Sequence, residues 1–200
     1  ASVTAQAVAL TTSGRPGPVV VVLPRDLTDG LVNNLDVPKP KPRPNVLPDP
    51  GAIEQASVMI NTAKCPLVLS GEIVAVQDCN DSLMALAESG GLPVMTTYRR
   101  QDTFSNQHPA YAGHLEINRL PYQREILKEA DLLIAVGSRM DGITSEDGLL
   151  PHDHQSLIQI YPDIDILTRC RADLPILSDL GPACRALAAK LEPRDGEIEK

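Results

Sequence analysis

Residues 130–139 read ADLLIAVGSR, a short apolar run that ends in a glycine. The uncharged residues 132–136 are too apolar for a strand with one face in water, and they are typical of a strand buried on both faces of a parallel sheet. A glycine directly after such a strand allows a sharp turn and the close approach of a ligand. We therefore expect a central strand whose carboxyl end is a candidate binding position.

Four further apolar runs lie on either side of this strand. They are residues 66–70, 93–97, 157–161 and 174–178. Helical patterns separate several of them, at residues 78–89, 123–130 and 180–191, and a further helix is predicted up to residue 63 with Asp49 as its N-cap and Pro50 in its first turn. Strands that alternate with helices predict βαβ units and a doubly wound parallel sheet of five to six strands.

Ligands of such sheets bind beyond the carboxyl ends of the strands. The loops at those ends are residues 71–72, 96–113, 137–140, 162–163 and 179–180. Gly137, Ser138 and Arg139 combine a small residue, a hydroxyl and a guanidinium, which suit a pair of phosphate oxygens. The alternative for these three residues is a strand-ending turn with a surface arginine.

Several motifs are missing from the sequence. Residues 69–73 read LSGEI in place of a glycine-rich dinucleotide fingerprint, and the chain has no P-loop motif, which disfavours an ordinary NAD-dependent oxidoreductase. His152 and His154 alternate in a loop without a third ligand, so we expect them to be solvated rather than metal-bound. His108 and His114 have no nucleophile at a catalytic spacing, and loop architecture is their expected role.

Composition excludes further classes of function. The 26 acidic and 18 basic residues give a net charge of −8, and one Phe, four Tyr and no Trp leave no stacking platform, so nucleic acid is not an expected partner. No apolar run is long enough to span a membrane and no signal pattern is present, so we expect a cytoplasmic chain. The four cysteines form no C-x-x-C pair and are expected to be small buried thiols.

The first fifty residues predict a domain boundary. Six prolines fall between Pro38 and Pro50, with Lys39, Lys41 and Arg43 among them, which is typical of a semi-rigid linker. Residues 19–23 read VVVVL after a helical pattern at residues 3–12, and we expect a buried strand there whose neighbours are missing. The predicted organisation is the end of a truncated domain (1–35), a linker (36–50), a central domain (51–192) and the start of another linker (193–200).

Five motifs together resemble the thiamine-diphosphate-dependent enzymes of the acetolactate synthase and 2-oxo acid decarboxylase type. They are SGRPGPVV at 13–20 with LPRD at 23–26, AESGGLPVMTT at 87–97, HPAYAGH at 108–114, ADLLIAVGSR at 130–139 and RADLPILSDL at 171–180. The resemblance implies that residues 1–35 are the tail of a pyrimidine-binding domain and that residues 51–192 are the Rossmann-like central domain.

The resemblance also implies where the chemistry lies. Enzymes of this family decarboxylate and ligate 2-oxo acids. A glutamate of their pyrimidine domain activates the aminopyrimidine of thiamine diphosphate, and a Gly-Asp-Gly motif of a third domain leads the magnesium and diphosphate site. The chain has no Gly-Asp-Gly, so we expect it to be a structural fragment that binds neither group and has no catalytic residue of its own. The implied partners are the flanking catalytic domains of the same chain, within a homodimer or homotetramer.

Central domains of this family hold FAD in a non-redox role, ADP, or no nucleotide. The matching positions are Gly71, Thr96, Thr97, Gly113, His114, Gly137, Ser138, Arg139, Asp163 and Asp179. Members with FAD read like HIDID where residues 159–163 read QIYPD, so Tyr161 replaces an acid suited to ribose hydroxyls. This change counts against a nucleotide. The alternative function is a free-standing nucleotide-binding or sensing module, which predicts a tight nucleotide site.

Overall fold

The computed structural model describes residues 2–31 and 43–194, and the chain divides into two compact units, residues 1–45 and 46–200. Pro38, Pro40 and Pro42, on which the linker prediction depends, lie outside the described residues. The predicted domain boundaries therefore stay predictions.

In the described part of the first unit, residues 2–31 and 43–45, there are one α-helix, α1 (Ser2–Thr11), and a 3-10 turn, η1 (Arg25–Leu27). The helix agrees with the pattern at residues 3–12. The strand predicted at residues 19–23 is wrong for this chain, since that segment forms no strand with any described residue and Val20 and Val22 are 85% and 81% exposed. A strand needs hydrogen-bonding neighbours, and this unit supplies none among its described residues.

The second unit is built on a six-stranded, all-parallel sheet with the order β3-β2-β1-β4-β5-β6. The strands are β1 (Pro66–Ser70), β2 (Val94–Thr96), β3 (Tyr111–His114), β4 (Leu132–Val136), β5 (Ser156–Tyr161) and β6 (Leu174–Leu177). Strand order reverses between β1 and β4, the point at which doubly wound sheets bind their ligands. The predicted Rossmann-like fold is confirmed.

The two central strands, β1 and β4, are fully buried and define the register of the sheet. In β1 and β4 every residue is buried, and Val68 lies opposite both Ile134 and Val94. Burial on both faces explains why these strands are continuously apolar rather than alternating. The strand β3 was missed in the sequence, where it was expected to be loop. It lies at an edge of the sheet, and its four residues are only half-buried.

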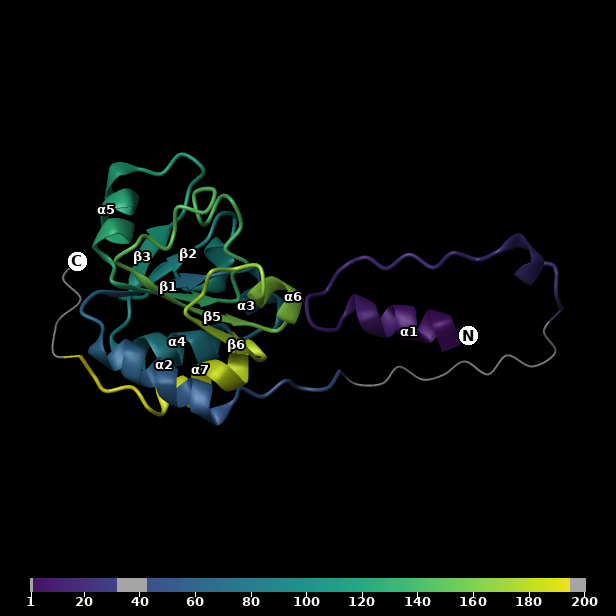
Figure 1. Cartoon of the computed structure of the whole chain (residues 1–200), viewed down its shortest axis with the longest axis horizontal. Coiled ribbons are helices and arrows are strands. Elements are labelled where there is room, and N and C mark those ends of the chain that lie inside the picture. The colour runs from purple at the N-terminus through teal and green to yellow at the C-terminus, as the bar shows by residue number, and fades with distance from the viewer. Residues whose placement is uncertain (1, 32–42, 195–200) are drawn as a thin grey trace. The chain divides into compact units, whose positions relative to one another are not determined.

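Helices cover both faces of the sheet (Figure 1). The helices α2 (Pro50–Thr62), α4 (Asn80–Gly90) and α7 (Leu180–Ala188) pack on one face, and α5 (Pro121–Glu129) packs on the other. The predicted N-cap of α2 is present, because the Asp49 carboxylate accepts a hydrogen bond of 2.9 Å from the backbone N–H of Ala52. The short elements α3 (Glu72–Val76), η2 (Gln101–Thr103) and α6 (Ile164–Leu167) follow strands β1, β2 and β5.

The core is aliphatic, as the composition predicts, and consists of one cluster on each side of the sheet. On the three-helix side, Ile134 packs with residues such as Leu83 of α4 and Leu187 of α7. On the opposite side, Leu133 packs with Leu127 of α5. Among the described ranges, no helix is both long and apolar enough to cross a membrane.

Candidate functional site

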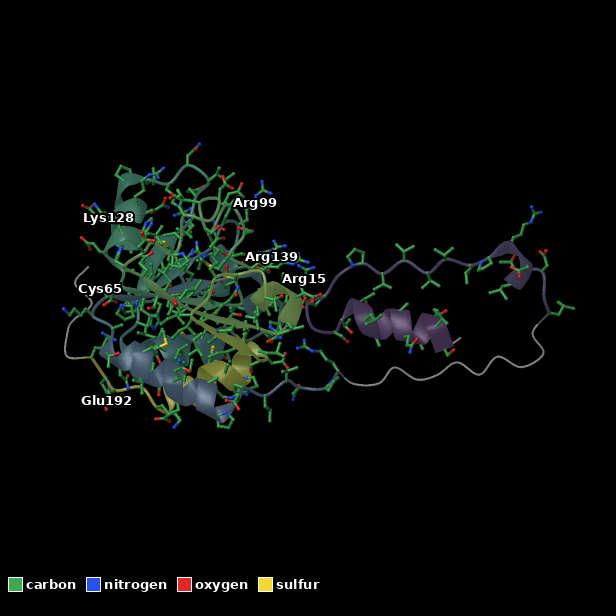
Figure 2. The ribbon with its side chains drawn as sticks, in the orientation of Figure 1. Arg15, Cys65, Arg99, Lys128, Arg139 and Glu192 are labelled. Atoms are coloured by element: carbon green, nitrogen blue, oxygen red, sulfur yellow. The ribbon has the colours of Figure 1, made fainter. Side chains whose placement is uncertain are left out.

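The ten residues predicted as a nucleotide site lie at the carboxyl edge of the sheet. Gly71 follows β1, Thr96 and Thr97 end β2, Gly113 and His114 end β3, Gly137, Ser138 and Arg139 follow β4, Asp163 follows β5 and Asp179 follows β6. Figure 2 shows Arg139 and Arg99 on this side of the sheet unit, and Cys65 and Lys128 on the opposite side. The parallel sheet thus collects side chains that are far apart in the sequence. Their role toward a ligand stays a prediction.

Gly71 and Gly137 bring the turns after β1 and β4 into direct contact. A Cβ atom on Gly71 would lie 2.4 Å from the carbonyl oxygen of Gly137, and one on Gly137 would lie 2.5 Å from the side chain of Leu180. Gly137 also has a φ of +66°, a conformation that favours glycine. The backbone N–H groups of Gly71 and Ile73 donate to the carbonyls of Val136 and Gly137, at 2.9 and 3.2 Å. Gly71 therefore packs its backbone against that of the β4 turn, and Gly137 leaves room for the side chain of Leu180.

Three side chains around Gly71 form a group that we call the Glu72 cluster, consisting of Glu72, Arg139 and Tyr161. Arg139 Nε lies 2.9 Å from Glu72 Oε1, and the Tyr161 hydroxyl donates to the same oxygen at 3.0 Å. The other end of the guanidinium lies 3.6 Å from the carboxylate of Asp141. Tyr161 is fully buried, whereas the Arg139 side chain is 45% exposed. The cluster joins the ends of the adjacent strands β1, β4 and β5.

Asp179 belongs to a second group, the Asp179 clamp, with Val46 and Gln77. Its carboxylate accepts from the Val46 N–H at 2.9 Å and from Gln77 Nε2 at 2.7 Å, while its own N–H donates to the Val46 carbonyl at 2.9 Å. Gln77 Oε1 in turn accepts from the N–H of Leu180 at 2.8 Å. The clamp fastens the chain before α2 to the end of α3 and the start of α7.

The remaining predicted residues contact neighbours of their own. The Asp163 carboxylate caps α6 by accepting from the N–H of Asp165 at 2.9 Å. His114 Nε2 lies 2.6 Å from Glu116 Oε1. Thr96 is buried and its Oγ1 has no hydrogen-bond partner. The structure therefore brings Gly71, Gly137, Ser138 and Arg139 together, whereas Asp163 and His114 are engaged separately by local partners.

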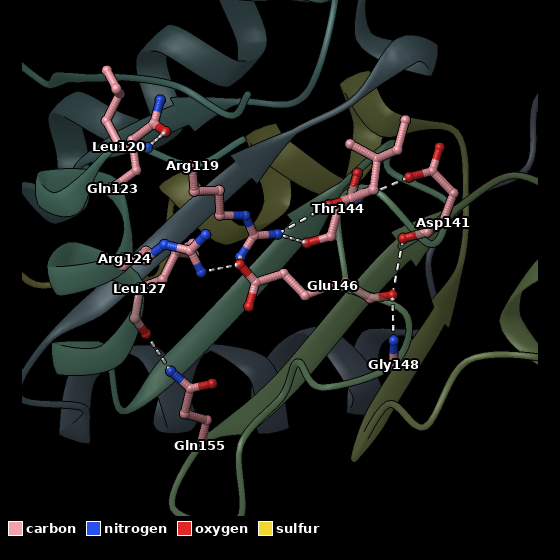
Figure 3. Close-up of polar contacts among 12 residues, drawn as sticks. Arg119, Leu120, Gln123, Arg124, Leu127, Asp141, Thr144, Glu146, Gly148 and Gln155 are labelled. Atoms are coloured by element: carbon pink, nitrogen blue, oxygen red, sulfur yellow. Dashed lines mark hydrogen bonds and ion pairs between the residues drawn. The ribbon is translucent and has the colours of Figure 1, made fainter. Parts of the chain in front are cut away.

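Arg119 is a buried residue that the sequence analysis missed (Figure 3). Its Nη2 donates to the carbonyls of Ile143 and Thr144 at 3.0 and 2.6 Å, and its Nη1 lies 3.1 Å from Glu146 Oε1. Burial lowers the pKa of the Arg119 guanidinium below its ordinary value, and the nearby Glu146 opposes that shift. Arg119 fastens the loop at residues 138–151, which begins with Ser138 and Arg139, to the segment before α5. No motif signals this role, because its partners lie more than 20 residues away.

The same loop is held at further points (Figure 3). Asp141 Oδ1 accepts from the N–H of Thr144 at 3.0 Å, and the Ser145 hydroxyl accepts from the N–H of Gly148 at 3.0 Å. Beyond the loop, Gln155 Nε2 donates to the carbonyls of Leu127 and Ala130 at 2.6 and 2.9 Å. These hydrogen bonds fix the backbone conformation of a loop that has no regular secondary structure.

The sequence predicts no metal site and four buried thiols. Within residues 2–31 and 43–194, no three His, Cys, Asp or Glu side chains are grouped to hold a metal ion. Cys79 and Cys184 are buried as expected. Cys170 is only half-buried and Cys65 is exposed, so the prediction of four buried thiols is wrong for these two. Cys65 precedes β1 at the amino edge of the sheet, where the chain enters from solvent. Burial, with a contribution from Asp78, raises the pKa of Cys79 to about 11, and burial raises that of Cys184 as well.

A hollow of about 490 Å³ lies between α4 and the segment around η2. Its lining includes Asn80, Asp81, Met84, Asp102 and Phe104. It contains none of the ten predicted site residues, so the predicted site and this hollow are different places.

The residues after β1 do not fit a nucleotide diphosphate. A diphosphate at this turn needs unoccupied backbone N–H groups and a positive field. Here the N–H groups of Gly71 and Ile73 already donate to the β4 turn, and the carboxylate of Glu72 adds a negative charge. FAD and ADP, which the resemblance implies for some members, are therefore poorly matched by this chain.

The sheet order and the helices on both faces define a doubly wound α/β domain. The model of the family described as "Thiamine pyrophosphate enzyme, central domain" matches residues 53–187, and the chain belongs to this family.

The relatives give the same classification. The chain is 36% identical to an acetolactate synthase large subunit of Corynebacterium glutamicum over 94% of its length, and 31% identical to a probable acetolactate synthase large subunit of Methanocaldococcus jannaschii over 91%. It is 28% identical to a sulfoacetaldehyde acetyltransferase of Rhodobacter capsulatus over 92%. These alignments cover 30%, 32% and 32% of the relatives, so the chain spans about a third of their length.

Two solved structures share the fold. A protein from Mycobacterium smegmatis described as a thiamin diphosphate-dependent enzyme matches 98% of this chain and 38% of its own, with a TM-score of 0.78 and 24% identity. The benzoylformate decarboxylase of Polynucleobacter necessarius matches 94% of this chain and 35% of its own, with a TM-score of 0.73 and 21% identity. At these identities the two structures establish the fold alone.

Proposed function

We propose that this chain serves as the central domain of a thiamine-diphosphate-dependent enzyme that acts on 2-oxo acids by decarboxylation and carboligation, as acetolactate synthase does. The observation that carries the proposal is the alignment of 195 residues, 94% of the chain, at 36% identity with an acetolactate synthase large subunit. The family match over residues 53–187 supports the same assignment.

In this proposal the domain is a structural unit and the reaction takes place in flanking domains. Thiamine diphosphate, held there with magnesium, supplies the carbanion chemistry of the reaction. The residues of this chain maintain the conformation of the central domain. The Asp179 clamp fixes the chain before α2 against the sheet, and Arg119 holds the loop that follows β4. A cytoplasmic homodimer or homotetramer, in which the domain joins the catalytic domains of its own chain, is part of the proposal.

The proposal is tested with the product of the complete gene that encodes this chain. We expect it to form an acetohydroxy acid from pyruvate when thiamine diphosphate and Mg²⁺ are added, measured by a colorimetric assay for acetoin after acid treatment. The 200-residue chain alone is the control and is expected to give no product. Turnover of pyruvate by the isolated chain would contradict the structural role.

A second substrate separates this proposal from its nearest competitor. The similarity to a sulfoacetaldehyde acetyltransferase over 92% of the chain is the reason to include sulfoacetaldehyde in the same assay. We expect pyruvate to be consumed and sulfoacetaldehyde to remain. If sulfoacetaldehyde were consumed and pyruvate were not, the chain would still belong to a thiamine-diphosphate-dependent enzyme, but the proposed 2-oxo acid substrate would be wrong.

A further inference from the structure

We infer that Glu72 closes the carboxyl edge of this sheet to flavin and adenine nucleotides, by placing its own carboxylate where a nucleotide diphosphate would need positive charge and free donors. The inference goes beyond the proposed function, since a structural central domain is compatible with a bound nucleotide or with none. It concerns the turn after β1, at the reversal of strand order between β1 and β4.

Three donors of this turn, the N–H groups of Gly71, Ile73 and Val74, are already engaged. A diphosphate at such a turn accepts hydrogen bonds from backbone N–H groups at the start of the following helix. In this chain the Gly71 N–H donates to Val136, the Ile73 N–H donates to Gly137 and the Val74 N–H donates to Gly71. A phosphate oxygen that accepted from Gly71 or Ile73 would have to break bonds that join the turn after β1 to β4 and its turn.

The positive charge of the site is also engaged. Arg139 is a cation beside the turn, and its guanidinium contacts two carboxylates, Glu72 at 2.9 Å and Asp141 at 3.6 Å. A diphosphate would compete with both for the same guanidinium and would be repelled by their charges. The ion pair is partly exposed, so the competition takes place at the surface, where a ligand would arrive.

Tyr161 fixes the carboxylate in this position. Its hydroxyl donates to Glu72 Oε1 at 3.0 Å, and its fully buried ring gives the hydroxyl a defined location at the end of β5. An acid at this place would accept from ribose hydroxyls, but a tyrosine that donates to Glu72 fills the space with an aromatic ring. The same residue thus removes a ribose acceptor and orients the group that opposes the diphosphate.

The test measures binding of ADP and FAD to the 200-residue chain by isothermal titration calorimetry. We expect no saturable binding to the wild type at millimolar ADP. The variant Glu72→Ala removes the carboxylate and releases Arg139, and we expect its affinity for ADP to rise at least about tenfold above the wild-type limit, the effect of one hydrogen bond to a charged group. The variant Glu125→Ala, which removes an exposed acid of α5, is the matched control and should behave as the wild type does.

Two more variants make the result decisive. Glu72→Gln removes the charge and keeps the side-chain size, so it serves if Glu72→Ala does not fold, and its circular dichroism spectrum shows whether the fold is kept. In the double variant E72A/R139Q the gain should disappear, because the released guanidinium is the group that binds. Stoichiometric binding of ADP or FAD to the wild type would overturn the inference. The absence of any gain in the folded Glu72 variants, or a gain that survives loss of Arg139, would overturn it equally.

Discussion

Two arginine–glutamate pairs each include one residue of the loop that follows β4, and they differ in burial. Arg119, with 2% of its side chain exposed, contacts Glu146 and two backbone carbonyls. Arg139, with 45% exposed, contacts Glu72 and Asp141. Removal of a buried arginine leaves acceptors without water, whereas removal of an exposed one lets water replace it. The first pair therefore contributes more to the stability of the loop than the second, which stays accessible at the surface.

The largest effect is expected for Arg119→Ala. The substitution leaves the carbonyls of Ile143 and Thr144 without their donor and leaves Glu146 with the exposed Arg124 alone, and we expect a loss of about 3 kcal/mol in the free energy of unfolding. Urea unfolding monitored by circular dichroism measures it. Arg124→Ala is the matched control, because Arg124 contacts the same Glu146 oxygen at 3.2 Å but is 59% exposed, and it should cost less than about 0.5 kcal/mol. Equal losses in the two variants would contradict the comparison.

An intermediate effect is expected for Asp179→Ala. Asp179 is 7% exposed, and its carboxylate accepts from Val46 and Gln77, so the variant leaves two donors unpaired and should cost about 2 kcal/mol. Asp163→Ala removes an exposed cap of α6 and is expected to cost about 1 kcal/mol in the same urea titration. If Asp163→Ala lowered the free energy of unfolding more than Asp179→Ala, burial would not explain the size of the loss.

Burial also predicts the behaviour of the thiols at high pH. The pKa of Cys79 is about 11 in the folded chain, against 9.0 for an unperturbed thiol, because burial disfavours the thiolate. Between these two values the unfolded chain gives up the proton and the folded chain keeps it. The stability from Cys79 is thus complete below pH 9.0 and is lost as the pH rises through about 11.

The measurement is the midpoint of urea unfolding as a function of pH. Its fall above pH 9.0 should be shallower in Cys79→Ala and unchanged in Cys65→Ala, because Cys65 is exposed. In the folded wild type, a thiol reagent at neutral pH should modify Cys65 and spare Cys79 and Cys184. Rapid modification of all three would show that Cys79 and Cys184 are accessible to solvent, against the burial seen at α4 and α7.

The smallest effect is expected for Arg139→Ala. Because its ion pairs are exposed, the loss in free energy of unfolding should be about 0.5 kcal/mol and should shrink further at high salt. Urea titrations at low and high ionic strength measure both quantities. A loss as large as that of Arg119→Ala would mean that Arg139 is a structural residue.

Local signals in the sequence were sufficient for much of the fold. The uninterrupted apolar runs at residues 66–70 and 132–136 correspond to β1 and β4, and Asp49 caps α2 as its residue type predicts. The strand β3 was missed because an edge strand that is half-buried lacks the apolar run that marks a central one. The valines at 19–23 misled for the converse reason, since an apolar run becomes a strand only where neighbours can pair with it.

The location of the ten candidate residues was predictable, but their contacts were not. The family resemblance supplied the residues, and the rule on carboxyl ends of strands predicts that they lie at one edge of the sheet, as they do. The partner of Arg139 could not be read from the sequence, since Glu72 lies 67 positions away and meets it only because β1 and β4 are neighbours. The roles of Arg119 and Gln77 were missed for the same reason, because each acts on backbone groups from distant segments.

The contact between Gly71 and Gly137 separates what can be changed at two neighbouring positions. No side chain can be added at position 71 without moving the β4 turn, since a Cβ there would lie 2.4 Å from a carbonyl oxygen. Position 72 begins α3, and its carboxylate contacts the side chains of Arg139 and Tyr161. A substitution at position 72 therefore changes the charge of this sheet edge while the backbone packing of Gly71 is kept.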